Sequence, residues 1–359
     1  MYRLKLFVTG LLVVTIAFIC CIKAQDVYVV GSDSEFGTLL WKNNESQSII
    51  RDLDSIFCWN TVYISEQAHS VCVFGSDVYI AGYQFKQIKD TLIRGRERRE
   101  EENLRHIYIA KIWKNGVAQN LTGGAYEAMA HSIFVYGNDV YVAGYEKNAQ
   151  GKKVAKLWIN EKAKDLSDGR EDAEAKSVYV VDNNIYVAGY GNGGKIAILW
   201  ENEVAQNLIE GRFPMGTEAR SVYVSGNDVY VAGVTKSEGY RDVAKLWKNG
   251  VVQILEGENI DASSVYVSDS DVYVVGVEAA AYRPVAKLWK NGVLQNIDNG
   301  TYRGTYARSV FVYGSDVYIA GVANGKTYDT TFALLWKNGI LQELSDGNGY
   351  GFANCVFVK

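Results

Sequence analysis

Histidines and basic residues recur at one fixed position of a repeated A-x-S motif, which becomes A-x-C in its last copy. The variable residue x reads, in chain order, His69, His131, Lys176, Arg220, Ser263, Arg308 and Asn354. Histidine can transfer protons near neutral pH, and lysine and arginine bind anionic groups. Five of the seven side chains can carry positive charge, so copies gathered around one centre would form a largely basic ring.

The residue two places before x adds acids and aromatic rings. It reads Gln67, Met129, Glu174, Glu218, Asp261, Tyr306 and Phe352. An acidic arc would then lie beside an aromatic arc, and a concave mouth of this kind could hold a sugar or a small anion. In the alternative, each acid pairs with the base two residues later, as Glu174 would with Lys176. Glu218 and Arg220 would do the same, and such surface ion pairs contribute little to stability.

The sequence offers no catalytic motif to accompany these residues. No cluster of His, Cys, Asp and Glu has the spacing of a metal site, and a metal shared by His69 and His131 would lack an evident third ligand. No glycine-rich phosphate loop precedes a helical pattern, and no G-x-S-x-G nucleophile motif occurs. We therefore assign no catalytic residue, no metal and no cofactor.

Three landmarks recur seven times each and define a repeat. A tryptophan stands at Trp41, Trp113, Trp158, Trp200, Trp247, Trp289 and Trp336. A D-V-Y-V-A-G motif places a tyrosine at Tyr28, Tyr79, Tyr141, Tyr186, Tyr230, Tyr273 and Tyr318, with a glycine three residues later. The A-x-S motif is the third landmark. Repeated large aromatic residues usually pack in a core, so we expect the tryptophans and tyrosines to fill the gaps between repeats.

Each repeat predicts four short strands. The first is S-V-Y-V, the second D-V-Y-V-A-G, the third A-K-L-W-K and the fourth V-L-Q-N-L or similar. Asn-Gly pairs such as Asn249-Gly250 favour a type I′ turn between the third and fourth strands. The first two strands are apolar at nearly every position, which indicates a sheet covered on both faces. Four-stranded sheets repeating every 40–50 residues predict an all-β, seven-bladed β-propeller of antiparallel blades.

The two ends of the chain predict how the ring closes. The repeat region begins with a second strand at 26–31 and ends with a first strand at 355–358. We expect the C-terminal strand to complete the N-terminal blade, so that residues 26–359 form one propeller domain. Because blade strands alternate in direction, the turns between the first and second and between the third and fourth strands share one end of the ring. The remaining connections share the other end, where length and composition vary as on a binding face.

The largest variation is an insertion in the second repeat, which explains why its tryptophan lies 72 residues after the first. Residues 84–106 carry seven basic and five acidic side chains. If the segment is helical, Arg96 could pair with Glu100 and Arg98 with Glu102. It would serve as a flap or partner-docking arm, or else as a mobile solvated loop. A second long connection, residues 51–67, lies on the same face.

Residues 1–24 resemble an export signal. Arg3 and Lys5 precede an apolar run over residues 6–22, and cleavage would follow Ala24. Lipidation of Cys20 or Cys21 is the alternative, and would provide a lipid anchor. Three other cysteines remain, Cys58, Cys72 and Cys355, and one pair of them could form a disulfide outside the cytoplasm. The candidate pairs are Cys58 with Cys72 and Cys58 with Cys355.

Composition narrows the possible partners. The chain has 359 residues, with 41 acidic and 37 basic side chains, which does not favour nucleic-acid binding. Two prolines, 35 glycines and 25 tyrosines favour strands and tight turns. Beyond the leader, no segment is apolar enough to span a bilayer. We expect a monomer in the periplasm, on the cell surface or outside the cell.

The repeat A-x-S-V-Y-V-x-G-N-D-V-Y-V-A-G resembles the propeller repeats of exported bacterial proteins over residues 26–359. It departs from kelch repeats, which need Gly-Gly where this chain has Ala-Gly. It also lacks the W-D dipeptide of tryptophan–aspartate repeats and the S-x-D-x-G-x-T-W box of sialidases. The resemblance implies a fold and an exported protein, and it transfers no catalytic residue.

These observations favour a non-enzymatic binding or scaffold protein that engages a protein or a glycan through the variable face. The alternative is a carbohydrate-active hydrolase or lyase with its site at the channel mouth. Glu174, Glu218 or Asp261 would then act together with one of the two histidines. A purely structural surface protein would bind neither class of ligand.

Overall fold

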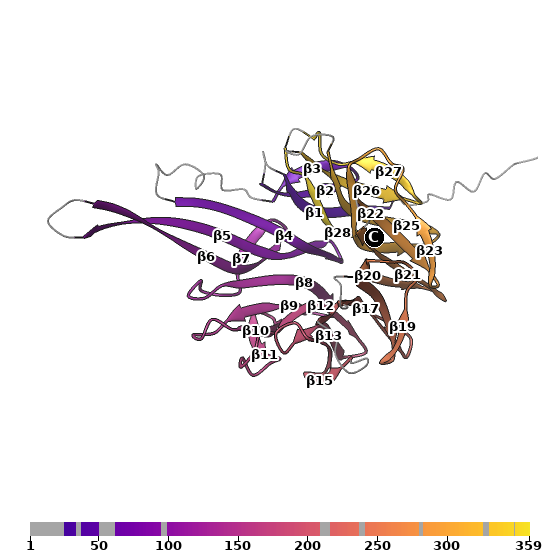
Figure 1. The fold of residues 1–359 in the computed structure, drawn as a ribbon, viewed down its shortest axis with the longest axis horizontal. Helices are drawn as coiled ribbons and strands as arrows, with labels where there is room; N and C mark the ends of the chain where they lie inside the picture. The colour runs from indigo at the N-terminus through magenta and orange to yellow at the C-terminus, as the bar shows by residue number, and fades with distance from the viewer. Residues whose placement is uncertain are drawn as a thin grey trace, which may run out of the picture.

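The computed structural model describes residues 25–33, 37–49, 62–94, 99–208, 216–236, 241–279, 283–325, 330–347 and 349–359. They form seven four-stranded antiparallel sheets arranged as the blades of a ring, a seven-bladed β-propeller, as the repeat predicted (Figure 1). Within those ranges no helix is long and apolar enough to cross a membrane. The predicted leader and its lipidation cysteines lie outside the described residues.

The strands are given blade by blade from the inside of the ring outward. Blade 1 contains β28 (Phe352–Val358), β1 (Val27–Asp33), β2 (Gly37–Lys42) and β3 (Glu45–Ser48). Blade 2 contains β4 (Val62–Phe74), β5 (Asp77–Arg94), β6 (Arg99–Lys114) and β7 (Val117–Asn120). Blade 3 contains β8 (Ala128–Tyr136), β9 (Asp139–Lys147), β10 (Lys153–Ile159) and β11 (Lys162–Asp165).

The other four blades follow the same order. Blade 4 contains β12 (Glu174–Val181), β13 (Asn184–Gly191), β14 (Ile196–Glu201) and β15 (Val204–Asn207). Blade 5 contains β16 (Gly216–Ser225), β17 (Asp228–Lys236), β18 (Asp242–Lys248) and β19 (Val251–Ile254). Blade 6 contains β20 (Ile260–Ser268), β21 (Asp271–Ala279), β22 (Pro284–Lys290) and β23 (Val293–Asn296). Blade 7 contains β24 (Gly304–Tyr313), β25 (Asp316–Asn324), β26 (Thr331–Lys337) and β27 (Ile340–Glu343).

The ring closes non-covalently through blade 1, as predicted. Strand β28 pairs antiparallel with β1, with Val356 opposite Val29. Asp26 and Lys359 exchange two backbone hydrogen bonds of 3.0 Å beyond the last strand residues. The inner strand of the first blade is therefore the last strand of the chain.

The short turns gather at one end of the ring, which we call the uniform end. The turn residues Asn249 and Gly250 have φ values of 51° and 77°, as a type I′ turn requires. Asn249 bonds the carboxylate of Asp228, which also forms an ion pair of 2.7 Å with Lys248. The same pair of contacts recurs around Asp26, Asp77, Asp271 and Asp316. The repeated aspartate therefore links the turn between the first two strands of a blade to the turn between the last two.

The tryptophans form the core between blades, as expected. All seven are at most 2% exposed, and the seven motif tyrosines are at most 8% exposed. One cluster joins Tyr141 and Leu157 of blade 3 to Val178 and Trp200 of blade 4. Each blade therefore packs against the next through residues that the repeat supplies.

Every inner strand contains a β-bulge at the variable residue x. In blade 5, Ala219 pairs with Gly233 and Ser221 with Ala232, which leaves Arg220 as the extra residue. The bulge brings the Glu218 carbonyl oxygen to within 2.0 Å of the place where a Cβ on Gly233 would lie. The glycine of D-V-Y-V-A-G is therefore required by the bulge, which in turn positions the site residues.

The serine after x joins neighbouring inner strands. Ser221 Oγ accepts a hydrogen bond from the backbone N–H of Val265 in the next blade, at 3.1 Å. Ser70, Ser132, Ser177, Ser264 and Ser309 make the same contact around the ring. Next to these serines, aromatic rings of successive inner strands contact one another at 4.6–4.9 Å between centroids, from Phe134 round to Phe357. Backbone and side chains thus hold the inner strands in a fixed circle.

Two thiols take ring positions that belong to other residue types. Cys72 occupies the aromatic position of β4 and is 5% exposed, and Cys355 occupies the serine position of β28. Both are free, whereas Cys58 lies outside the described residues, so the proposed pairings stay predictions. Burial raises the pKa of the Cys72 thiol to about 12, which keeps it protonated and unreactive.

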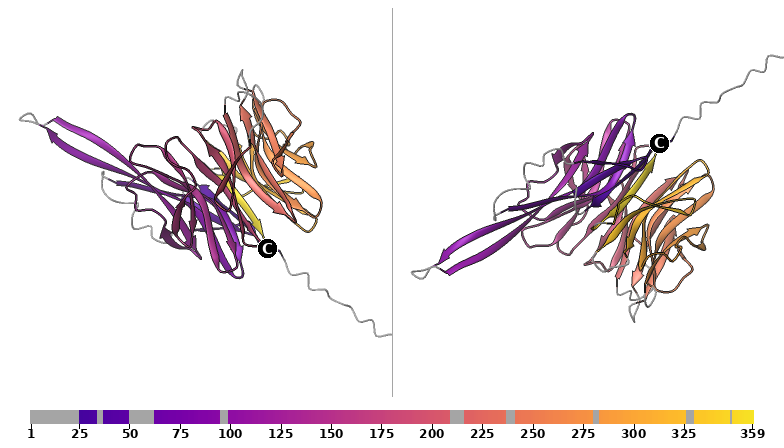
Figure 2. Two further views of the ribbon diagram at one scale, coloured as in Figure 1. Left: turned by 90° about the horizontal axis from the view of Figure 1, so that it is seen from below. Right: turned by 90° about the horizontal axis from the view of Figure 1, so that it is seen from above.

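The insertion in blade 2 is a β-hairpin, and the helical alternative is wrong. Strands β5 and β6 continue past the ring and pair without interruption to Arg94 and Arg99 (Figures 1 and 2). The first half of β4 pairs along β5 as far as Ile88, so part of the second long connection is also strand. Arg96 and Arg98, and with them the two helical pairs considered above, lie outside the described residues. We call residues 84–109 the arm.

Candidate functional site

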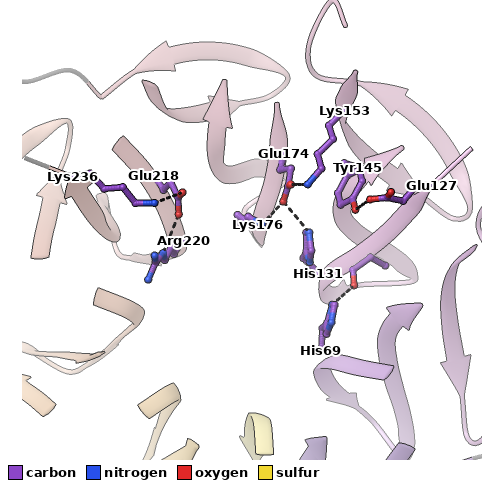
Figure 3. A network of polar contacts seen from close by, with 11 residues as sticks. His69, Glu127, His131, Tyr145, Lys153, Glu174, Lys176, Glu218, Arg220 and Lys236 are labelled. Atoms are coloured by element: carbon purple, nitrogen blue, oxygen red, sulfur yellow. Dashed lines mark hydrogen bonds and ion pairs between the residues drawn. The ribbon is translucent and has the colours of Figure 1, made fainter. Parts of the chain in front are cut away.

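Glu174 is the centre of a buried charge network at the mouth of the channel (Figure 3). It is the first residue of β12 and is 2% exposed. Its carboxylate forms ion pairs with Lys153 of β10 and Lys176 of its own strand, and it lies 3.3 Å from Nε2 of His131. Lys153 also lies 4.4 Å from the centroid of the Tyr145 ring. The predicted pairing of Glu174 with Lys176 is present, but its carboxylate is buried while the lysine side chain stays partly exposed.

This environment makes Glu174 unsuited to proton donation. Burial alone would raise the pKa of the carboxyl, but His131 and the two lysines stabilise the ionised form and lower the pKa well below its usual range. A carboxyl that acts as general acid near neutral pH needs a raised pKa. Glu174 therefore positions its cationic neighbours around the mouth.

The two mouth histidines lie side by side and are neutral near pH 7. Nδ1 of His69 lies 3.0 Å from the carbonyl oxygen of Ala130, and its ring stacks on His131 with centroids 5.4 Å apart. Burial is the main cause that lowers the pKa of both rings, that of His69 to about 3. Of the five positions that could be cationic, the two histidines therefore add no charge at neutral pH.

These neutral histidines predict a loss of stability in mild acid. The unfolded chain takes up protons on histidine below about pH 6.5, whereas native His69 does so only near pH 3, so the unfolded state gains free energy as the pH falls between these values. His69 alone should reduce the free energy of unfolding by about 2 kcal/mol between pH 7.5 and pH 5. Urea denaturation at both values measures it.

His69→Gln should flatten that pH dependence. The matched control is His106→Gln, whose side chain is exposed on the arm and should leave the acid sensitivity unchanged. The chain has only three histidines, and carboxylates titrate mostly below this range, so few other groups contribute. Equal pH dependence in wild type and His69→Gln would contradict the assignment.

Arg220 lies between the two other acids of the mouth, Asp261 and Glu218. Nη1 of Arg220 donates to Oδ2 of Asp261 at 2.6 Å, and its Nε lies 3.4 Å from Oε2 of Glu218. Although burial favours the neutral form, these two carboxylates raise the pKa of Arg220. Asp261 also accepts a hydrogen bond from the backbone N–H of Val277. Glu218 and Asp261 are therefore both paired with the same arginine.

The aromatic arc is completed by Arg308. Its guanidinium lies 5.4 Å from the centroid of the Phe352 ring and donates to Oδ1 of Asn354. Asn354 in turn donates to the carbonyl oxygen of Ala68 at 2.7 Å. In the part of the chain that the structure describes, Arg308 makes no ion pair with a carboxylate. It is the mouth cation best placed to meet an anionic group.

A row of aromatic rings leads from the mouth onto the arm. The His69 ring lies 5.3 Å from that of Tyr83, and Tyr83 lies 5.9 Å from Tyr108. Phe85 follows at 5.0 Å from Tyr108, and the exposed His106 at 5.4 Å from Phe85. Tyr83, Phe85 and Tyr108 are each partly exposed. The arm and the mouth therefore present one continuous surface.

The sequence did not indicate several residues that the structure places on this face. Tyr145 and Lys147 of β9 both bond the carboxylate of Glu127, at 2.5 and 2.6 Å. Lys153 and Asp242 begin the third strand of their blades at the mouth end. The sequence could have indicated Lys153 and Asp242, because each lies five residues before the tryptophan of its repeat.

No group of three or more His, Cys, Asp and Glu side chains is placed to hold a metal ion among the described residues. The stacked histidines have Glu174 beside only one of them, and that carboxylate is already held by two lysines. The mouth is thus built from ion pairs and stacked rings.

No protein-family model matches the chain, and no curated protein matches it. Solved structures are similar in fold at 11% sequence identity. AofleA from Arthrobotrys oligospora covers 83% of this chain and 92% of its own length, with a TM-score of 0.43. The periplasmic gluconolactonase PpgL of Pseudomonas aeruginosa covers 93% and 99%, with a TM-score of 0.47. The Pyrococcus horikoshii acylaminoacyl peptidase covers 79% and 53%, with a TM-score of 0.44. At this identity the similarity concerns the fold alone.

Proposed function

We propose that this protein is an exported, non-enzymatic binding protein that engages a protein or glycan partner through the mouth and the arm. The observation that carries the proposal is the contrast between the two ends of the ring. The uniform end repeats one Asp–Asn–Lys arrangement in most blades. The other end differs from blade to blade in charge, aromatic content and length, and it carries the arm. Variation confined to one face supports recognition there.

The chemistry of the mouth supports binding over catalysis. Hydrolysis of a glycosidic bond needs a carboxyl that holds a proton and a second carboxylate free to attack or to activate water. Glu174 is held by two lysines, and Arg220 contacts both Glu218 and Asp261. The partly exposed aromatic row instead offers apolar faces with polar neighbours, a composition suited to sugar rings or to a partner's side chains.

The test compares partner capture by variants of each end. We expect the protein without residues 1–24 to retain a partner in a pull-down or on a glycan array. Replacing residues 87–106 by Asn-Gly, which joins the opposed Lys86 and Ile107 by a two-residue turn, should reduce capture about tenfold or more. Lys248→Ala changes the uniform end and is the matched control.

Catalysis makes a different prediction for the mouth. Replacing Glu218 and His131 together should abolish turnover if the protein is a hydrolase or lyase, whereas a binding protein has no turnover to lose. Turnover of a captured glycan that disappears in this double variant would overturn the proposal. Equal capture by the arm-shortened variant and wild type would exclude the arm as part of the binding surface.

A further inference from the structure

A cavity of about 300 Å³ opens where blades 5, 6 and 7 meet. Asp242 begins β18, Asn259 precedes β20, and Tyr306 lies on β24 of the following blade. The remaining lining residues are Asp261, Val277, Ala279 and Pro284. The volume is at the lower end of the range for small-molecule sites. Val277, Ala279 and Pro284 are the apolar part of the lining, and the other four residues carry polar groups.

Asp242 differs from Asp261 in having no ion-pair partner for its carboxylate among the described residues, although Lys236 and Arg220 act on it from a distance. Its backbone N–H donates to Oδ1 of Asn259, but no donor or cation contacts its carboxylate. Burial is the main cause that raises the pKa of Asp242 and Asp261 acts in the same direction, whereas Lys236 and Arg220 only partly offset them. A carboxylate left in this position gains from any cation that enters the cavity.

The neighbouring cations are already engaged. Arg220 bonds Asp261 at 2.6 Å and also contacts Glu218, while Lys236 lies 3.9 Å from the same Glu218. Among the described residues, Glu218 and Asp261 thus take the ion pairs of Arg220 and Lys236, and neither cation forms an ion pair with Asp242.

We propose that this cavity binds an organic ammonium group on a short apolar stem, with Asp242 as its counter-ion and Tyr306 as its aromatic wall. The ammonium would donate to the carboxylate, and the Tyr306 ring would add a cation–π contact. Val277 and Pro284 would pack against the stem. This inference rests on the proposed binding function, because it assigns a ligand chemistry to part of the same face. The group could belong to a free amine or to a lysine side chain of a partner.

The apolar wall favours an ammonium ligand over a neutral sugar. A sugar needs donors and acceptors around most of its edge, and three of the seven lining residues are the apolar Val277, Ala279 and Pro284. Asn259 is also committed, because its Nδ2 donates to the carbonyl oxygen of Ala279 at 2.6 Å. The carboxylate is thus the main group left for recognition.

The test is a calorimetric or NMR titration of the protein with n-butylamine, with butan-1-ol and glucose as uncharged probes. A capped lysine, N-acetyl-lysine methylamide, distinguishes a lysyl source from a free amine. We expect butylamine to bind and butanol not to bind. Asp242→Asn should weaken binding about tenfold or more, because it removes the charge without changing the shape.

The matched controls separate charge and ring contributions. Asp165→Asn removes an exposed acid on β11 and should leave amine binding unchanged. Tyr306→Phe should also leave it unchanged, whereas Tyr306→Leu should weaken it about threefold or more. Glucose binding that is insensitive to Asp242→Asn, or amine binding unchanged in that variant, would overturn the assignment. Partner capture by the arm is scored separately, so loss of amine binding alone leaves the proposed function standing.

Discussion

Replacing Gly233 with alanine should unfold blade 5 or cost on the order of 4 kcal/mol of stability or more. The added Cβ would lie 2.0 Å from the carbonyl oxygen of Glu218 and 3.1 Å from the Cα of Ala219. Both are backbone atoms, so no side-chain rotation relieves the overlap. The bulge would have to open, and Arg220 would then lose its direction into the mouth. Urea denaturation followed by far-UV circular dichroism measures the loss.

The matched control for this substitution is Gly123→Ala. No atom lies within 4 Å of a Cβ built at Gly123, and its φ is not positive. Alanine there should be neutral or slightly stabilising, because it restricts the unfolded chain. If both variants lost the same stability, the close approach at Gly233 would not be the reason for the glycine.

The fold followed from the repeat because each landmark performs one structural task. Trp247 fills the gap between blades, and Asn249-Gly250 closes a turn that needs two positive φ values. The order of strands at the chain ends then predicted closure. By contrast, the bulge left no separate signal in the sequence. The only trace of the bulge is the glycine of D-V-Y-V-A-G, for which the repeat pattern alone gives no reason. The bulge itself depends on how the backbones of two strands pair.

The site was predicted only in part, for physical reasons that differ by residue. The repeat predicted that His69 and His131 occupy equivalent positions in neighbouring blades, where their rings stack, but their neutrality depends on burial that spacing does not reveal. Lys153 reaches Glu174 from β10 of the neighbouring blade, a contact that depends on how the two blades pack. The arm is a hairpin because β5 and β6 pair along their whole length. The spacing of its charges was equally compatible with a helix.

Trp200→Ala should reduce the free energy of unfolding by about 3–5 kcal/mol. The ring is 1% exposed and packs between blades 3 and 4, against Leu157 and Val178. It also donates from Nε1 to the carbonyl oxygen of Leu166 at 2.9 Å. The same cluster contains Ala175, the neighbour of Glu174, so the cavity left by the substitution would loosen the strand that carries the charge network.

Phenylalanine substitutions separate packing from hydrogen bonding. Trp200→Phe leaves the Leu166 carbonyl without its donor and should cost about 1 kcal/mol more than Trp158→Phe. Among the described residues, Nε1 of Trp158 has no hydrogen-bond partner, so that variant breaks no such bond. Equal losses in the two phenylalanine variants would show that the bond contributes nothing. A small loss in Trp200→Ala would mean that the blades are held together mainly by the inner-strand serines, and the mouth would then tolerate far more change in its supporting core than the packing suggests.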